Sequence, residues 1–295
     1  MIDAKTACKA YGATTLFVLL WGSGAIFSKW GLAHATPFAF LALRFALALA
    51  ALLALGGLAR QPWLPPAGTR GRVAATGLTM IGGYSICYFL ALDHGITPGV
   101  LATTLDAQPL LTLALLERRF PLPRLLGLAL AMAGLALVVW DSIGLARYSA
   151  VGMLYALGAL LCMTGGAILQ KSLRQPPLRA LPLQYAAGLL LCLACVPFQP
   201  WRVDAGPQLL VPLLWLGLVI SVGATLLLYR LIQAGNLVNV TSLFYLVPGV
   251  TALLDYLLLG NRLSLPALAG MAAILGGLAL VLRTAPGPAP GKQPA

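Results

Sequence analysis

The chain has 295 residues, of which 60% are hydrophobic and only 9% are charged. Charged residues make up roughly a quarter of a soluble globular domain, so this composition excludes an ordinary soluble protein. The formal net charge is +12, but no basic patch with interleaved aromatic residues accompanies it, and no nucleic-acid partner is expected.

Apolar stretches near the ~20 residues that cross a bilayer as a helix recur along the whole chain. The alternating pattern of an outer-membrane barrel is missing. The sequence therefore predicts an all-α membrane protein with ten transmembrane helices in the lipid bilayer. The expected spans are 11–32, 36–58, 72–92, 97–116, 122–140, 149–170, 181–199, 208–231, 237–259 and 264–283.

The order of features in the first half of the chain returns in the second half. Residues 24–29 (Gly-Ala-Ile-Phe-Ser-Lys) resemble residues 166–171 (Gly-Ala-Ile-Leu-Gln-Lys), and the run Gly-Leu-Ala-Leu-Val occurs at 134–138 and at 277–281. Since each half has an odd number of helices, the second half must enter the membrane from the opposite side, as in the inverted repeats of many secondary transporters. We expect a first five-helix repeat at 1–145, a second, inverted one at 146–284 and a disordered cytoplasmic tail at 285–295.

The distribution of cations predicts the orientation. If the N-terminus lies inside, the outer loops hold only Arg147, Arg202 and Arg262, and the other lysine and arginine residues outside the spans fall on the cytoplasmic side. This asymmetry follows the positive-inside rule. We expect a multi-pass protein of a bacterial-type inner (plasma) membrane with both termini in the cytoplasm, and a monomer is expected to suffice because both halves lie in one chain.

The first expected helix carries Trp21, Ser23 and, near its outer end, Lys29. An indole at mid-depth lies away from the interfacial belt where tryptophan is usually found, so Trp21 is expected to line a cavity. Lys29 either extends outward to the interface or takes part in gating.

Helices two and three add a cation and two phenols. Arg44 would be costly against lipid, so it should face the bundle or water, either as an anchor for helix ends or as a substrate contact. Its counterpart in the second half is Gln184. Tyr84 and Tyr88 are four residues apart and share one helix face, which indicates either a polar-aromatic path or a core stripe.

The fourth helix has a polar centre with Asp106, Gln108 and Pro109. A carboxylate at this depth is by default a functional candidate. Asp106 is expected to face a transport path, and the alternative is a structural ion pair with Arg44 or Lys29. Pro109 frees the carbonyl group one turn earlier for other partners.

In the second half Met163 stands where the first has Trp21, and Tyr245 falls opposite Asp106. A site around the axis that relates the halves would then have an acid on one wall and a phenol on the other. Pro248 is the counterpart of Pro109. The cysteines, including the pair Cys192 and Cys195, are interpreted as packing residues, because no second ligand pair accompanies them; no metal and no cofactor are expected.

Several short motifs, taken in order, resemble the drug/metabolite transporter superfamily, in its ten-helix EamA type. They are Leu-Leu-Trp-Gly-Ser-Gly at 19–24, Leu-Arg-Phe at 43–45, Gln-Pro-Leu-Leu-Thr at 108–112 with Glu-Arg at 117–118, Val-Pro at 247–248 and Gly-Asn-Arg-Leu-Ser at 260–264. Asn261 departs from the pattern, since the second repeat of the family usually has glutamate there. The resemblance implies a central cavity between the halves, alternating access and export of amino acids or other small metabolites.

The sequence therefore predicts a secondary transporter, and an exporter of amino acids or related metabolites is favoured over a proton-coupled transporter of drugs or other metabolites. The expected substrate contacts are Trp21, Ser23, Tyr84, Tyr88, Asp106, Gln108, Gln184 and Tyr245. Lys29 and Arg44 are expected as gating or structural charges, and Pro109 and Pro248 as helix breaks. Asp106 would meet a cationic amino group or carry a coupling proton, so both proton coupling and facilitated diffusion are open.

No enzyme is expected, because the sequence has no HExxH, P-loop or nucleophile-elbow motif.

Overall fold

A computed structural model of the chain describes residues 4–116, 121–138, 149–247, 249–250 and 265–283. In these ranges the regular structure is helical, with one isolated β-bridge between Ala35 and Val203. The first half contains α1 (Ala4–Leu32), α2 (Pro37–Leu58), η1 (Ala67–Thr69), α3 (Arg70–Thr76), η2 (Gly77–Gly83), α4 (Tyr84–Asp93), α5 (Pro98–Leu105), α6 (Gln108–Leu116) and α7 (Leu122–Val138). The second contains α9 (Ala150–Ser172), α10 (Pro177–Cys195), η3 (Val196–Phe198), α11 (Pro207–Leu214), η4 (Trp215–Ala224), α12 (Thr225–Ala234), α13 (Leu237–Ser242), η5 (Leu243–Tyr245) and α15 (Leu265–Arg283).

Six of the described helical stretches are long and apolar enough to cross a membrane. They are Thr14–Leu32, Pro37–Leu58, Ala67–Asp93, Ala150–Ser172, Pro177–Phe198 and Pro207–Ala234, and the shorter apolar helices are Val100–Leu116, Leu122–Val138 and Leu268–Arg283. Large leucine side chains on these helices face outward, among them Leu154 at 68% exposure and Leu190 at 67%. Water would disfavour such a surface, whereas the acyl chains of a bilayer cover it. The expectation of an all-α membrane protein is confirmed.

Helix starts follow local sequence signals. Proline occupies the first turn of α2, α5, α10 and α11, where its fixed φ fits the helix and its missing N–H needs no partner. For this reason α10 begins at Pro177, four residues before the start expected at residue 181. At α5 the Thr97 side chain accepts a hydrogen bond from the Val100 N–H, a typical N-cap.

The fourth expected span is divided. α5 ends at Leu105, and α6 begins at Gln108 after a turn formed by Asp106 and Ala107. Pro109 has no N–H to offer the carbonyl of Leu105, so the regular bond ladder cannot pass through this point. The interruption lies directly before Pro109, where the sequence predicts a helix break, and Pro248 lies outside the described residues.

One long helix in each half contains a π-helical middle. η2 joins α3 to α4, and η4 joins α11 to α12. Such wide turns are uncommon and often occur at functional sites. Here the two segments approach the centre of the molecule, where η2 packs on α10 and η4 packs on α2.

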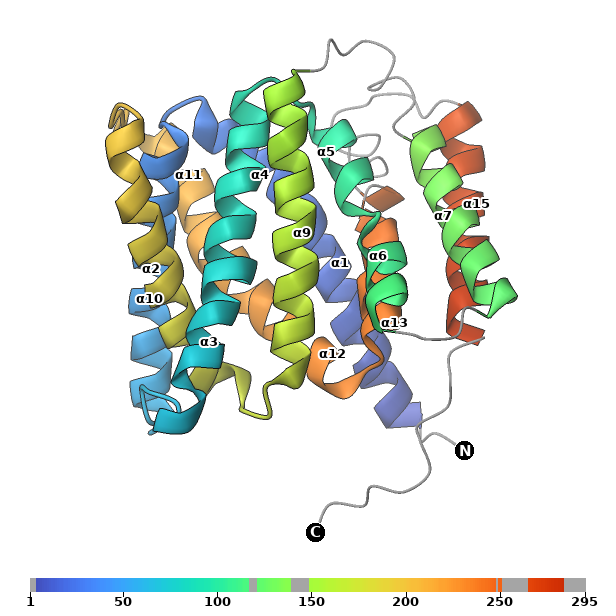
Figure 1. Cartoon of the computed structure of the whole chain (residues 1–295), viewed down its shortest axis with the longest axis horizontal. Coiled ribbons are helices and arrows are strands. Elements are labelled where there is room, and N and C mark those ends of the chain that lie inside the picture. Colours follow the sequence, from blue (N-terminus) through green and yellow to red (C-terminus); the bar gives the residue numbers. More distant parts are fainter. Residues whose placement is uncertain (1–3, 117–120, 139–148, 248, 251–264, 284–295) are drawn as a thin grey trace.

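α7 and α15 form a close antiparallel pair at one edge of the bundle (Figure 1). Gly127 lies against Gly277, and Gly134 lies against Gly270. A Cβ atom on Gly127 would come within 2.7 Å of the Gly277 carbonyl oxygen, and one on Gly134 within 2.6 Å of the Gly270 carbonyl oxygen. The repeated glycine spacing in the sequence thus lets two backbones touch, which is the usual role of small residues between membrane helices.

Candidate functional site

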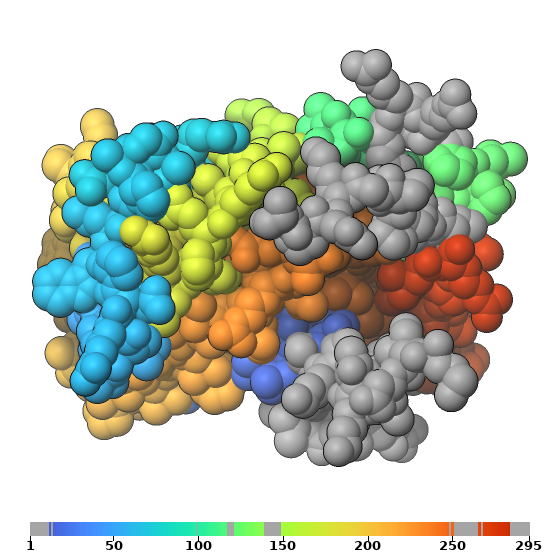
Figure 2. Space-filling view, turned by 90° about the horizontal axis from the view of Figure 1, so that it is seen from below, coloured from blue at the N-terminus to red at the C-terminus, as the bar shows by residue number. Residues whose placement is uncertain are grey.

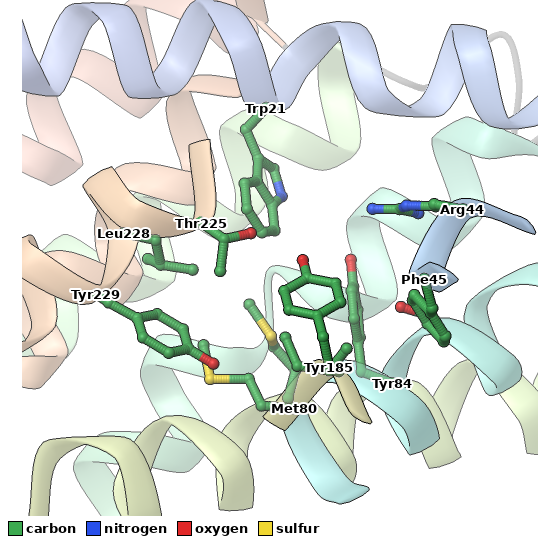
Figure 3. Close-up of a pocket in the computed structure, with 12 residues that line it drawn as sticks. Trp21, Arg44, Phe45, Met80, Tyr84, Tyr185, Thr225, Leu228 and Tyr229 are labelled. Atoms are coloured by element: carbon green, nitrogen blue, oxygen red, sulfur yellow. The ribbon is translucent and has the colours of Figure 1, made fainter. Parts of the chain in front are cut away.

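A small cavity lies near the centre of the bundle, with walls from both halves of the chain (Figure 3). It has a volume of about 30 Å³, which is room for two or three water molecules at roughly 10–15 Å³ each. Its lining comes from α1, α2, η2, α4, α9, α10 and α12. The lining residues are Trp21, Arg44, Phe45, Met80, Ile81, Tyr84, Ser85, Met163, Tyr185, Thr225, Leu228 and Tyr229.

Arg44 carries the positive charge of this cavity. Its Nε donates a hydrogen bond of 2.9 Å to Ser221 Oγ on η4. The guanidinium extends toward the side of the cavity to which the Tyr84 and Tyr185 phenols point (Figure 3). Its electrostatic neighbours are tyrosines, and no acidic side chain occurs among the lining residues. The site therefore presents a cation without a neighbouring protein carboxylate in its wall.

The π-helical η4 segment supplies the partners that hold this wall together. Its Ser221 carbonyl accepts a bond of 2.7 Å from the Tyr185 hydroxyl, while the Ser221 side chain accepts from Arg44. Thr225 Oγ1 donates to the Ile220 carbonyl at 3.0 Å. A wide turn displaces carbonyl groups from the α-helical ladder, and here side chains satisfy them. One residue of η4 thus positions both Arg44 and Tyr185.

Aromatic pairs pack around the cavity. Trp21 on α1 packs on Phe17 and on Phe244 of η5, with ring centroids 5.3 Å and 5.4 Å apart. Phe45 and Tyr185 meet edge to face at 5.9 Å. Such pairs stabilise by ~0.5–1.5 kcal/mol beyond the area they bury. The Trp21 indole is one of the residues that line the cavity.

Asp106 lies in the turn between α5 and α6 and is only 5% exposed. Its Oδ2 is buried and has no hydrogen-bond partner among the described residues. The phenols of Tyr84 and Tyr245 lie within electrostatic range of the carboxyl group. Within the described ranges it forms no ion pair with Arg44 or Lys29, the alternative that the sequence left open. Asp106 is thus buried close to the cavity residue Tyr84 but is not part of the cavity lining.

Two other expected substrate contacts, Ser23 and Gln184, form hydrogen bonds with residues outside the cavity lining. The Ser23 hydroxyl accepts a bond of 2.8 Å from the Trp215 indole and donates to the Leu20 carbonyl. Gln184 is fully buried and donates to Gln170 Oε1 at 2.9 Å.

Among the remaining candidates, Tyr88 packs on Tyr84 with ring centroids 5.7 Å apart and ring planes tilted by 52°. Gln108 Nε2 and the Tyr245 hydroxyl are buried without a partner among the described residues. Lys29 is exposed. Of the candidate residues, Trp21, Arg44 and Tyr84 are brought together at the cavity.

Sequence reasoning did not select Tyr185, Tyr229 or Ser221 as site residues. Tyr185 directly follows Gln184, and Tyr229 is the one tyrosine of α12, with its hydroxyl buried and unpartnered among the described residues. A polar atom within an apolar run was the signal available for each of them. Lys171 and Arg124, whose contacts are described below, were counted only as cytoplasmic cations.

Comparison with known proteins gives consistent matches. The model of the EamA-like transporter family matches the chain twice, at residues 9–140 and at residues 150–283. A protein of Salmonella typhimurium (strain LT2), named a probable amino-acid metabolite efflux pump, is 26% identical over 283 residues, which cover 89% of this chain and 91% of that protein. A solved crystal structure superposes with a TM-score of 0.74 at 23% identity, covering 91% of this chain and 94% of that one. At this identity the structural likeness shows a shared fold.

Proposed function

Because the chain belongs to the EamA-like transporter family, we propose that it exports amino acids or related small metabolites by alternating access. The family and the apolar helices make it a multi-pass membrane protein. The name of the Salmonella relative supports amino-acid metabolites as the substrate class.

The observation that carries the proposal is the environment of Arg44. A guanidinium binds a carboxylate through charge-assisted, often bidentate hydrogen bonds, and this cavity offers it no carboxylate from its own lining. Trp21, Tyr84 and Tyr185 provide aromatic surface beside it for an apolar side chain. A small molecule with a carboxylate and an apolar part fits this wall.

The size of the cavity indicates that transport requires rearrangement. Ligand pockets occupy ~300–1,000 Å³, whereas this cavity has about 30 Å³. The helices around it must therefore separate on one side to admit an amino acid. This supports alternating access between two differently opened states.

We propose ten transmembrane helices arranged as two inverted five-helix repeats, residues 1–145 and 146–284. The two matches of the family model support the duplication. Residues at equivalent positions in the halves also meet: Phe45 packs on Tyr185, and Trp21 and Met163 both line the cavity. The glycine pairs of α7 and α15 are reciprocal, as a two-fold relation between antiparallel helices requires.

For the orientation we propose a bacterial-type inner membrane with both termini in the cytoplasm. The exposed cations Arg60 and Arg174 then lie inside, in agreement with the positive-inside rule. Both walls of the cavity come from one chain, so a monomer is sufficient for transport.

Asp106 supports proton coupling as the mode of transport. A buried carboxyl group with an unpartnered oxygen can bind a proton in one state of the cycle and release it in the other. The phenol of Tyr84 is an electrostatic neighbour of both this group and Arg44.

Flux of labelled amino acids in proteoliposomes tests the proposal, with wild type compared to Arg44→Gln and Arg44→Lys. We expect uptake of apolar and aromatic amino acids, a loss in Arg44→Gln and partial activity in Arg44→Lys, which keeps the charge but not the planar fork. Arg202→Gln, at an exposed arginine, is the matched control and should transport normally. Transport of none of the amino acids by wild type would refute the amino-acid assignment, and flux unaffected by Arg44→Gln would refute the role of Arg44.

A further inference from the structure

Residues 232–239, which connect α12 to α13, form several hydrogen bonds with neighbouring segments. We call this segment the α12–α13 corner. Lys171, near the end of α9, donates from Nζ to the carbonyl oxygens of Ile232, Gln233 and Gly235 at 2.6, 3.1 and 2.5 Å. All three donors of the ammonium group can be used in this way.

These bonds satisfy groups that the helix itself leaves open. The last carbonyls of a helix have no partner within it, and Gly235, the residue after α12, has an extended backbone instead of the left-handed conformation of a glycine cap. The ammonium charge also interacts favourably with the negative end of the helix dipole. Lys171 therefore joins α9 to α12 and supplies the cap that α12 lacks.

Two further contacts hold the same corner. Arg124 on α7 is fully buried and donates from Nη2 to Asn236 Oδ1 and Asn239 Oδ1, each at 2.9 Å. Gln233 donates to the Gln175 carbonyl in the loop after α9, at 2.6 Å. Hydrogen bonds from Arg124 of α7 and from Lys171 of α9 thus both hold the corner.

The corresponding corner at the opposite end of the molecule, between α4 and α5, is built differently. There Gly95 has φ +84° and its N–H bonds to the Leu92 carbonyl, while the Ile96 N–H bonds to the Ala91 carbonyl, a Schellman ending that needs no partner helix. Lys29, which occupies the position in α1 that Lys171 occupies in α9, is exposed and makes no hydrogen bond among the described residues. The α4–α5 corner thus closes through its own backbone, whereas the α12–α13 corner is held by side chains of α7 and α9.

We propose that the α12–α13 corner is a gate and that Lys171 is the positioning residue that keeps it closed. This inference rests on the proposed transport function. Figure 2 shows the end of the molecule where the corner lies, and α9, α12 and α13 pack together in the centre of that face. For a path to open toward this end, the bonds from Lys171 must break and α9 must separate from α12.

Electron paramagnetic resonance distance measurement in nanodiscs tests the gate without any substrate. Spin labels are placed on Ser172→Cys at the end of α9 and on Arg230→Cys of α12, both exposed positions, in a background without the native cysteines. We expect Lys171→Met to add a longer-distance component that is absent with Lys171 intact. Asn239→Ala, which removes one acceptor of Arg124, should add the same component to a smaller extent.

Lys29→Met is the matched control, because it removes the equivalent lysine of the first half and should leave the distribution unchanged. If Lys171→Met and Asn239→Ala, each monodisperse and with an intact melting transition, both give the wild-type distribution, the gate is refuted. An equal change in Lys29→Met would also refute it, because the effect would not depend on the corner. Since no substrate is involved, a failure of amino-acid flux in liposomes would not be confused with a failure of the gate.

Discussion

Ser221 orients Arg44, because the bond to its hydroxyl holds Nε and leaves the rest of the guanidinium directed toward the cavity. Binding a carboxylate in two places at once requires the plane of the guanidinium to be fixed beforehand. A residue that never touches the substrate can therefore set its affinity.

Ser221→Ala should raise KM for a transported amino acid about ten-fold, the equivalent of losing one hydrogen bond to a charged group. The physical reason is the freed rotation of the guanidinium. Initial uptake rates over a range of substrate concentrations measure it. Ser85→Ala removes a hydroxyl from the same cavity lining without touching Arg44 and should keep the wild-type KM; an unchanged KM in Ser221→Ala would contradict the role of Ser221.

At Asp106 we expect the substitution Asp106→Asn to abolish acceleration of transport by a pH gradient. The amide keeps the size of the side chain but cannot exchange a proton, so any remaining flux should follow the substrate gradient alone. Proteoliposomes with and without an imposed gradient give the comparison. Asp204→Asn, at an exposed loop carboxylate, should respond as wild type does; a gradient-driven Asp106→Asn would show that the coupling proton binds elsewhere.

Among the elements, the pair α7 and α15 depends on contact between backbones. Gly134→Ala should lower the melting temperature of the purified protein, because the new methyl group meets a carbonyl oxygen at 2.6 Å and forced overpacking costs ~1–3 kcal/mol. Thermal unfolding in detergent checks this expectation. Gly24→Ala, where a Cβ would have nothing within 4 Å, is the control; a Gly134→Ala protein as stable as this control would mean that the helices separate at little cost.

The helices themselves follow closely from the sequence. The length of the apolar stretches predicted their order, and the described ends differ from the expected ones by a few residues at most helices. The sequence points to a helix break at Pro109, and the turn that interrupts the fourth span lies just before it, at Asp106 and Ala107. π-helical winding has no comparable signal in composition or spacing, so η2 and η4 could not be foreseen.

The site was less predictable for a physical reason. Arg44 and Ser221 are 177 residues apart in the chain, and their contact depends on how α2 packs against η4. Periodicity gives the face of one helix but not the partner that meets it. Residues expected from polarity alone, such as Ser23 and Gln184, proved to bond to other helices, whereas Tyr185, one residue away from Gln184, lines the cavity.

For the whole molecule, the orientation can be tested with two exposed loop positions. Arg60→Cys follows α2, and Arg202→Cys precedes α11, and the proposed topology puts these loops on opposite sides of the membrane. A membrane-impermeant maleimide applied to intact cells should label Arg202→Cys and label Arg60→Cys only after permeabilisation. The cysteine-free parent is the control for background labelling, and the reverse pattern would place both termini outside.

The π-helical segment in each half of the molecule would become longer if the same residues were wound as an α-helix. A return from π to α winding advances the rest of a helix by about 1.5 Å and turns it by about 100° for each residue released. The exchange replaces one set of backbone bonds with another, so no helix has to unfold. Tyr84 directly follows η2, and Thr225 directly follows η4. Such a change in winding turns these side chains of the cavity wall relative to the part of each helix that precedes η2 or η4.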